Sequence, residues 1–290
     1  MAYIDEVVSG GTVYGILQSA AYPGADLTAV HAAEIGSDPW AWIKSRIQAG
    51  NFSGIHVGDW IPFTADGRTY HAQIAGIDTY LGYGDTEVGH HIDFITQELL
   101  TEGHGFNKVN YNNGTSGDAS PWLASDLYHW LNSLSGNVPN AAAADPATVA
   151  VDYTSTGVYD KLPAALQAVI AEKRLYTETR YTAGSLLTSS NSAGWASLGK
   201  LWLPTETEVC GFPAFGTLTQ SSRGSMGQYP LFARTSARIK TRSGSRSYWW
   251  LLNAAEGDNK SFCRIDRYGF VSTTNASTAT IYAPICFRIA

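Results

Sequence analysis

The chain has 290 residues, of which 44% are hydrophobic and only 15% are charged. This composition excludes intrinsic disorder, and the length allows one elaborate domain or two ordinary ones. Tryptophan and tyrosine are abundant, with 9 and 16 residues. Such side chains are typical of half-buried strands and of contact surfaces.

The net charge of −6 conceals an asymmetry along the chain. Residues 1–199 hold 8 Lys/Arg against 20 Asp/Glu, a balance of −12, whereas residues 200–290 hold 11 against 5, a balance of +6. Such a split can serve a contact between domains, attraction to an acidic partner, or ordered assembly of copies. Because the basic residues form no known motif and the whole chain is acidic, we expect no nucleic-acid partner.

The N-terminal stretch "MAYIDEVVSGG" contains two acids and no long apolar run, so we expect no signal peptide. No segment has the length and hydropathy of a membrane span, and we expect synthesis in a cytoplasm. Cys210, Cys263 and Cys286 lack CxxC spacing. They indicate buried free thiols rather than a disulfide framework or a zinc site.

Residues 1–54 are expected to form an N-terminal attachment and assembly arm in front of a domain of residues 55–290. Within the arm, "DPWAWIKSRIQAG" (38–50) predicts a short helix, because Asp38 can cap it and Gly50 can end it. Its apolar residues share one face: Trp40, Ile43 and Ile47. The aromatic residues expected to make the arm's assembly contacts are Tyr14, Tyr22, Trp40 and Trp42.

Residues 55–77 alternate apolar and polar side chains on either side of "TADG" (64–67), which predicts a β-hairpin. Further on, "SPWLASDLYHWLNSLSG" (120–136) has apolar residues at helical spacing, with Ser120 as the expected cap and Gly136 as the end. A second amphipathic helix is expected in "KLPAALQAVIAEKR" (161–174), built on Leu162, Leu166, Val169 and Ile170.

Beyond residue 200 the chain alternates short strand-like pieces with polar loops. The pieces expected to form strands are "LWLP", "SYWWLLN", "SFCRID", "YGFVST" and "APICFRIA". No repeat of fixed period is present in the sequence, which disfavours a solenoid or a propeller.

The order of six short motifs resembles a known family: "WLxxxLYHWLNS", "LPAALQAVI", "LWLPTETEVCG", "YPLFARTSARIK", "YWWLLNA" and "PICFRIA". They resemble an uncharacterised domain found in gut bacterial, prophage and phage surface proteins, which is related in plan to C-type lectins and formylglycine-generating enzymes. The resemblance covers roughly residues 55–290. The chain departs from the pattern at Leu252, where a basic residue is common, and at Pro284, which is displaced forward.

This resemblance implies an α+β fold of the C-type-lectin-like class. In that plan two amphipathic helices pack on twisted antiparallel strands, the first and last strands pair, and long loops carry function. Loops on a rigid scaffold can change sequence without damage to the core.

The pair Trp249 and Trp250 lies between a basic run that ends at Arg246 and a polar loop. Successive residues of a strand point to opposite faces, so the two rings are not expected in the same core layer. We expect one ring to be buried. The other is either beneath a loop or on a contact surface, where an aromatic ring beside arginine suits a sugar or a protein.

The following loops, "NAAEGDNKS" and "RIDRYG", are rich in oxygen-bearing side chains that could hold Ca²⁺ or contact a ligand. Solvated turns remain the simpler interpretation, because the spacing matches no known calcium loop. The residues concerned are Asn253, Glu256, Asp258, Asn259, Arg264, Asp266, Arg267 and Tyr268, of which Asn253, Asp258, Asn259, Arg267 and Tyr268 join Arg246, Trp249 and Trp250 as expected partner contacts.

The segment "GDTEVGHHIDF" (84–94) with His104 contains residue types that bind transition metals. The weak candidates are His90, His91 and His104, with Asp85 and Asp93 as possible co-ligands. Adjacent histidines on a strand diverge, so a structural hydrogen-bonding role is the favoured interpretation, and we expect no metal and no other cofactor.

Enzymatic chemistry finds little support in the sequence. Formylglycine-generating enzymes depend on a cysteine pair, and Cys263 and Cys286 fall on strands expected to be neighbours, but their apolar surroundings favour inert thiols. No nucleophile elbow, phosphate loop or triad pattern occurs. We therefore expect no enzyme, with a copper-dependent oxidase that uses Cys263 and Cys286 as the least favoured alternative.

Two functions remain open. The first is a non-enzymatic structural component of a phage or prophage particle, a capsid- or tail-associated decoration protein located in the virion. It would form homo-oligomers and contact other virion or surface proteins. The alternative is a lectin-like adhesion module that binds a host glycan or a receptor protein.

Overall fold

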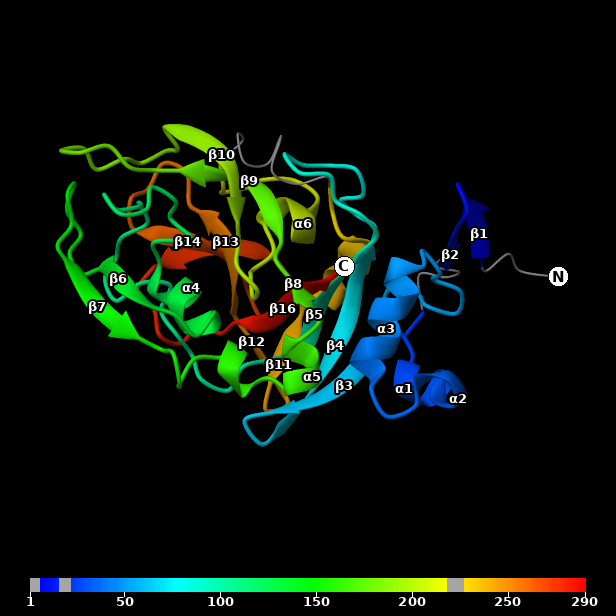
Figure 1. Cartoon of the computed structure of the whole chain (residues 1–290). Helices are drawn as coiled ribbons and strands as arrows, with labels where there is room; N and C mark the ends of the chain where they lie inside the picture. Colours follow the sequence, from blue (N-terminus) through cyan, green and yellow to red (C-terminus); the bar gives the residue numbers. More distant parts are fainter. Residues whose placement is uncertain (1–5, 16–21, 218–226) are drawn as a thin grey trace.

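The computed structural model describes residues 6–15, 22–217 and 227–290, and these form a mixed α/β fold made mostly of strands (Figure 1). The helices are short: α1 (Leu27–Val30), α2 (Ala32–Ile35), α3 (Pro39–Gln48), α4 (Asp126–Leu131), α5 (Ala164–Gln167) and α6 (Glu206–Cys210), with 3₁₀ turns η1 (Tyr159–Lys161), η2 (Pro230–Ala233) and η3 (Thr235–Arg238). No helix among the described residues is long and apolar enough to cross a membrane.

The strands fall into one large sheet and several small ones. The large sheet contains β3 (Trp60–Ala65), β4 (Arg68–Ile77), β5 (Ile92–Leu99), β8 (Ile170–Ala171), β11 (Lys240–Arg242), β12 (Ser245–Ser247) and β16 (Pro284–Ile289). A second sheet contains β13 (Trp249–Ala254), β14 (Ser261–Ile265) and β15 (Val271–Asn275). The hairpins are β1 (Glu6–Ser9) with β2 (Thr12–Gly15), β6 (Ser135–Pro139) with β7 (Thr148–Asp152), and β9 (Arg174–Thr179) with β10 (Ser192–Ser197).

Strand β5 is the centre of the large sheet, which curls because its ladders carry register shifts. β16 pairs with β5 along the whole strand, from Ile289 opposite Ile92 to Pro284 opposite Leu99. β4 and β11 therefore share the other edge of β5. β4 pairs with residues 92–96, and β11 pairs in parallel near Glu98.

The helix predicted for residues 38–50 is confirmed as α3. The Asp38 side chain accepts hydrogen bonds from the backbone N–H groups of Trp40 and Ala41, and Pro39 occupies the first turn. Trp40 is only 3% exposed, and its ring meets those of Phe94 and Phe287 at centroid distances of 6.3 and 5.9 Å. The helix thus lies on one face of the large sheet (Figure 1) and shares its core.

The predicted hairpin is also confirmed, as β3 and β4. Asp66 and Gly67 connect the strands with φ values of 50° and 72°. Two positive φ angles define the type I′ turn that matches the twist of paired strands.

The prediction of a long helix over residues 120–136 is wrong in extent, because only α4 is helical. Ser125, not Ser120, caps it by accepting from the Tyr128 N–H at 3.1 Å. The first helical N–H groups are satisfied from outside: Asp126 donates to the Asn107 side chain and Leu127 to the Phe106 carbonyl. Local periodicity could not reveal these distant partners, and the predicted end at Gly136 lies in β6.

The second predicted helix, over residues 161–174, is also wrong in extent. Only α5 is helical, and Ile170 and Ala171 form β8 at the edge of the large sheet. Ile170 pairs with Ile289 of β16. Long-range strand pairing has overridden the helical pattern of the segment.

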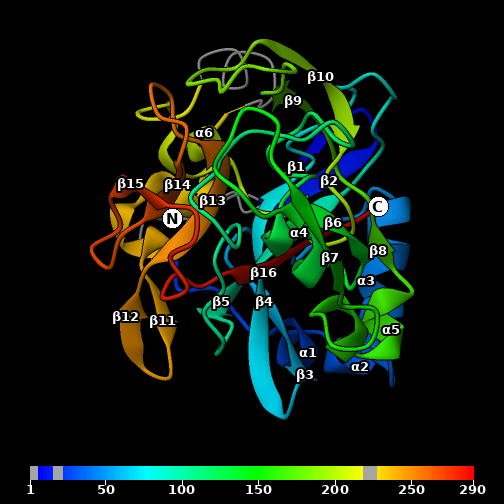
Figure 2. The ribbon, with the colours of Figure 1, turned by 90° about the vertical axis from the view of Figure 1, so that its left-hand side faces the viewer.

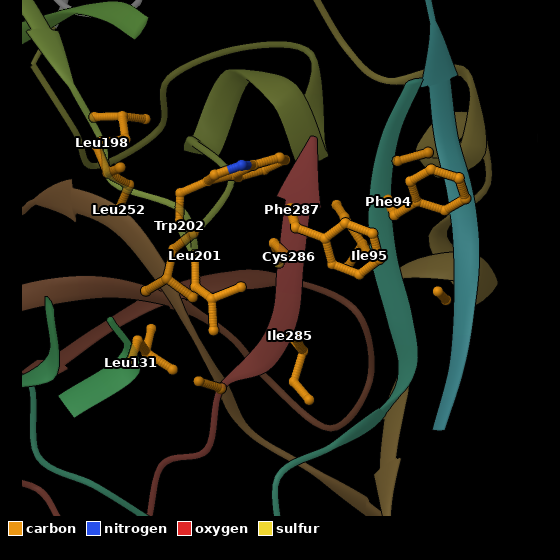
Figure 3. Close-up of a cluster of buried hydrophobic side chains, with 14 of the residues drawn as sticks. Phe94, Ile95, Leu131, Leu198, Leu201, Trp202, Leu252, Ile285, Cys286 and Phe287 are labelled. Atoms are coloured by element: carbon orange, nitrogen blue, oxygen red, sulfur yellow. The ribbon is translucent and has the colours of Figure 1, made fainter. Parts of the chain in front are cut away.

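The piece "LWLP" is not a strand, although its side chains are buried. Figure 3 shows Leu201 and Trp202 packed between β16 and β13, close to Cys286 and Leu252. The Trp202 N–H donates to the Cys286 carbonyl at 3.2 Å. The other four predicted pieces overlap β13, β14, β15 and β16.

A buried network of charges joins the large sheet to the elements around it. Arg288 of β16 donates from Nε and Nη2 to the two carboxylate oxygens of Asp93 on β5, at 2.7 and 2.8 Å. Tyr229 donates to Asp93 at 2.7 Å and accepts from the Lys173 ammonium at 2.8 Å. Lys173 also donates to Glu208, which accepts from Tyr80 at 2.5 Å.

The members of this network are enclosed almost completely. The Lys173 ammonium lies 3.9 Å from the centre of the Trp202 ring. Arg288 holds the pKa of Asp93 below its usual range despite burial, whereas burial lowers the pKa of Lys173. A buried charge is tolerated only with a partner, so each pair depends on both members.

We predict that Lys173→Met destabilises the protein by about 3–5 kcal/mol, because the buried Glu208 carboxylate loses the ammonium that pairs with it. The double variant Lys173→Met/Glu208→Gln is expected to recover part of this loss. Urea unfolding of the wild-type chain and both variants measures the difference. Equal stability of the single variant and the wild type would contradict the role of the pair.

Candidate functional site

A groove of about 760 Å³ lies where β4 and β11 separate along the shared edge of β5. Gln73 of β4 and Gln97 of β5 form its floor. The Gln73 side chain donates to the Gly58 carbonyl at 3.0 Å. Within the described part of the chain, no hydrogen bond engages the Gln97 amide, so this group is available to a ligand.

One wall of the groove is the N-terminal segment around Tyr22 and Pro23. Asp59, which is fully buried, anchors this wall. It accepts from the Tyr22 hydroxyl and, at 2.8 Å each, from the backbone N–H groups of Ala25 and His56. Burial and the adjacent Asp59 raise the pKa of Tyr22. Tyr22 is the one predicted arm residue that the structure places in the groove.

The opposite wall consists of η2, η3 and the start of β11. Pro230, Leu231 and Ile239 make it largely apolar, and Arg234 is exposed beside them. Lys240 lies beneath this wall, where its ammonium donates to the Thr96 carbonyl. Burial lowers the pKa of Lys240 to about 8.

Trp249 and Trp250 are both fully buried, so of the two alternatives for the second ring the contact surface is wrong, and neither ring is available to a partner. Trp249 supports the groove from below: its indole donates to the Arg238 carbonyl at 2.9 Å, and its ring faces the Lys240 ammonium at 5.7 Å. Trp250 points to the other side, where it donates to the His104 carbonyl at 2.8 Å. The two rings do diverge, but both faces of β13 are covered.

The loop after β13 is closed by Arg180, which is fully buried. Its Nη1 atom donates to the carbonyls of Ala255 and Asp258, both at 2.9 Å. Asn253 is buried too, and its side chain accepts from the Glu206 N–H at 2.6 Å. The Arg180 guanidinium thus already supplies a positive charge to these loop carbonyls.

Other polar contacts complete the loop. Asn112 donates to the Asp258 and Ser261 carbonyls at 3.0 and 2.7 Å, and the Asn259 carbonyl accepts from the Asn112 N–H at 3.3 Å. Asp258 and Asn259 therefore belong to an internally bonded loop, and neither lines the groove.

We predict that Ca²⁺ or a chelator leaves the midpoint of thermal unfolding unchanged, because Arg180 already satisfies the loop carbonyls. Binding of Ca²⁺ to the native state would raise the midpoint with concentration. Differential scanning calorimetry with added CaCl₂ and with EDTA tests this. A rise of the midpoint with Ca²⁺ would show that the loop accepts the ion beside the arginine.

The remaining predicted contacts lie on the surface of β12 to β15, outside the groove lining. Arg246 is exposed, and Tyr268 is 54% exposed. The Arg267 guanidinium lies 5.3 Å from the Tyr268 ring and 6.0 Å from the Tyr248 ring. The Arg264 guanidinium also lies over the Tyr248 ring, 4.3 Å from its centre.

The three predicted arm residues whose side chains are described occupy three different environments. Trp40 is inside the core, so the prediction that it contacts a partner is wrong. Trp42 is half-buried and stacks with His31 and the Arg46 guanidinium, at 4.9 and 5.4 Å. Tyr22 lines the groove, and the side chain of Tyr14 lies outside the described residues. The arm boundary at residue 54 remains a prediction.

The three candidate histidines have separate structural partners. His90 contacts Asp78 at 2.7 Å. His91 accepts from the Tyr80 N–H at 3.1 Å, and burial lowers its pKa to about 4. His104 stacks on Trp130 at 4.5 Å. Across residues 6–15, 22–217 and 227–290, no three metal-binding side chains converge.

The prediction that Cys263 and Cys286 lie on neighbouring strands is wrong. Cys263 is in β14 and Cys286 in β16, which belong to different sheets. Burial raises the pKa of both thiols, as it raises that of Cys210 to about 11. Thiols in this state are poor nucleophiles and poor metal ligands.

The molecule is therefore a mixed α/β domain built around a curled sheet, with a ligand-sized groove at one sheet edge. Residues 94–289 match a family described as "Domain of unknown function (DUF6273)". The match covers about two-thirds of the chain, so the chain belongs to this family. No curated protein and no solved structure matches it.

The matched region begins within β5 and ends within β16, the two strands that pair at the centre of the large sheet. These are the first and last strands of the matched region, which is shorter than the expected domain of residues 55–290. The expected pairing of the first and last strands of residues 55–290 is wrong: the first strand, β3, pairs with β4, and no pairing among the described strands joins it to β16.

Proposed function

We propose that this chain is a non-enzymatic binding and assembly module that holds an extended, acidic segment of a partner protein in the groove. The observation that carries the proposal is the groove itself, which opens between two strands at the edge of β5. Side-chain amides such as those of Gln73 and Gln97 can bond an extended backbone as a neighbouring strand does.

The walls of the groove would select the side chains of the bound segment. The apolar side chains of η2 and η3 offer contacts to the alternate residues of an extended segment. Arg234 and Lys240 are the charged residues among those that line the groove, and Arg234 is exposed. An acidic segment is favoured by this charge.

The setting we propose is a phage or prophage particle, with a C-type-lectin-like plan for the domain. The resemblance of the sequence motifs supports the setting, and partners would be other virion proteins or further copies of this chain. The paired first and last strands of the matched region and its long loops support the plan (Figure 2).

We predict that Ala237→Trp, which fills the groove, weakens binding of selected peptides at least tenfold, or about 1.4 kcal/mol. A display library of short random peptides selected against the full chain supplies the probes, and acidic sequences are expected to dominate. Ala183→Trp, at an exposed turn outside the groove, is the matched control.

Arg234→Glu is expected to reverse the preference for acidic peptides without loss of folding, because this side chain is exposed. Peptides that bind Ala237→Trp and the wild type equally well would place their site elsewhere. A library without any enriched binder would also contradict the proposal.

The setting has its own test. Particles purified from the host that carries this gene are expected to contain the chain as a stoichiometric component, detectable by mass spectrometry. Its absence from the particles, with the protein present in the cell lysate, would reject the particle setting and leave the groove proposal standing.

A further inference from the structure

A second, polar pocket of about 400 Å³ lies between α4, the loop of residues 115–118 and the β6–β7 hairpin. α4 contributes Tyr128 and His129, and the hairpin contributes Asn137 and Thr148. The volume is within the range of small-molecule sites, about 300–1,000 Å³. None of its lining residues belongs to the groove.

The loop that carries Asp118 is fixed by its own backbone. The Asp118 N–H donates to the Thr115 hydroxyl at 3.2 Å, and one carboxylate oxygen of Asp118 accepts from the Ser120 N–H at 2.9 Å. A side chain at Gly114 would approach the Ala119 carbonyl to 2.3 Å, so only glycine permits this tight loop. Within the described residues, the second carboxylate oxygen of Asp118 has no hydrogen-bond partner.

His129 is oriented as an acceptor. Its Nδ1 atom lies 2.8 Å from the Ser125 carbonyl, a contact that requires the proton on Nδ1. In the tautomer with this proton the lone pair is on Nε2, and no described residue bonds this atom. Gly136 makes room for the ring, because a Cβ there would lie 2.4 Å from Nε2.

Tyr128 supplies an aromatic surface to the same pocket. Its ring is held edge-on against Trp122, with centroids 5.4 Å apart. Burial raises the pKa of Tyr128, and the neighbouring carboxylate of Asp118 adds to the rise. The phenol is therefore neutral and can donate a hydrogen bond.

The lining selects a class of ligand. It combines acceptors on Asp118 and His129 with the hydroxyls of Thr115, Ser116 and Thr148, and it contains no lysine or arginine. An anion would be repelled by Asp118, and an apolar ligand would leave the polar groups around Leu123, Ala124 and the Tyr128 ring without hydrogen-bond partners. A neutral ligand rich in hydroxyl groups can satisfy these acceptors and pack on the tyrosine ring.

We propose that this pocket binds a neutral saccharide unit, with Asp118 and His129 accepting hydrogen bonds from its hydroxyl groups. The pocket acts independently of the groove, so the chain has two binding sites for different classes of ligand. The same chemistry serves a free sugar and the terminal unit of a glycan.

The test uses the full chain and two probe sets: free neutral mono- and disaccharides followed by calorimetry, and an array of immobilised glycans. Thr148→Trp fills the pocket from an exposed hairpin position, and Asp118→Asn keeps the loop bond while replacing the free acceptor oxygen with a donor. Each is expected to weaken saccharide binding at least tenfold. Thr64→Trp, an exposed strand threonine of another hairpin, is the matched control.

The groove variant Ala237→Trp is expected to leave saccharide binding unchanged, which separates this proposal from the proposed function. If the chain binds the immobilised glycans but no free sugar, the ligand is the terminal unit of a glycan. If it binds both the glycans and the free sugars, a single saccharide unit is sufficient for binding. Binding that survives Thr148→Trp and Asp118→Asn, or no binding of either probe set at millimolar concentration, would overturn the proposal.

Discussion

The bidentate ion pair between Asp93 and Arg288 is the contact on which the other elements depend. It joins the central strand β5 to the last strand, β16, inside a core that excludes water. An unpaired charge there would cost several kcal/mol, so the pair fixes which two strands must be neighbours. Through Tyr229 and Lys173 it extends to Glu208 at the start of α6. Glu208 in turn closes a capping box with Thr205, so the same carboxylate that neutralises the lysine also begins a helix.

This network also positions the groove, since Tyr229 is the residue directly before η2. Its hydroxyl is bonded to Asp93, and its ring lies so close to β4 that a Cβ at Gly76 would approach it to 2.8 Å. The other end of the wall is tied by Lys240 to the Thr96 carbonyl of β5. The groove wall is thus anchored at both ends to the sheet whose edge it overhangs. Such anchoring limits the entropy that a ligand must overcome when it binds.

Local signals in the sequence predicted α3 and the β3–β4 hairpin, because Asp38 and the Asp66–Gly67 turn act within a few residues. The predictions of two long helices were wrong because distant residues decide the structure of both segments. The Phe106 carbonyl accepts from the first turn of α4, and β16 pairs with Ile170. Strand alternation correctly separated Trp249 from Trp250, but it could not show that both faces of β13 are covered. The glutamines of the groove carry no sequence signal at all. They become a site only because β4 and β11 diverge on the same edge of β5.

The charge asymmetry of the chain does not come from the buried network of Asp93, Lys173, Glu208 and Arg288. In the network, Asp93 and Lys173 cancel within residues 1–199, and Glu208 and Arg288 cancel within residues 200–290. The balances of −12 and +6 are therefore carried by side chains outside the network. Several of the cations, among them Arg234, Arg246 and Arg267, are exposed. A surface of this kind is attracted to acidic partners, and the acidic part of another copy is one such partner, which connects the groove's preference for an acidic segment to assembly.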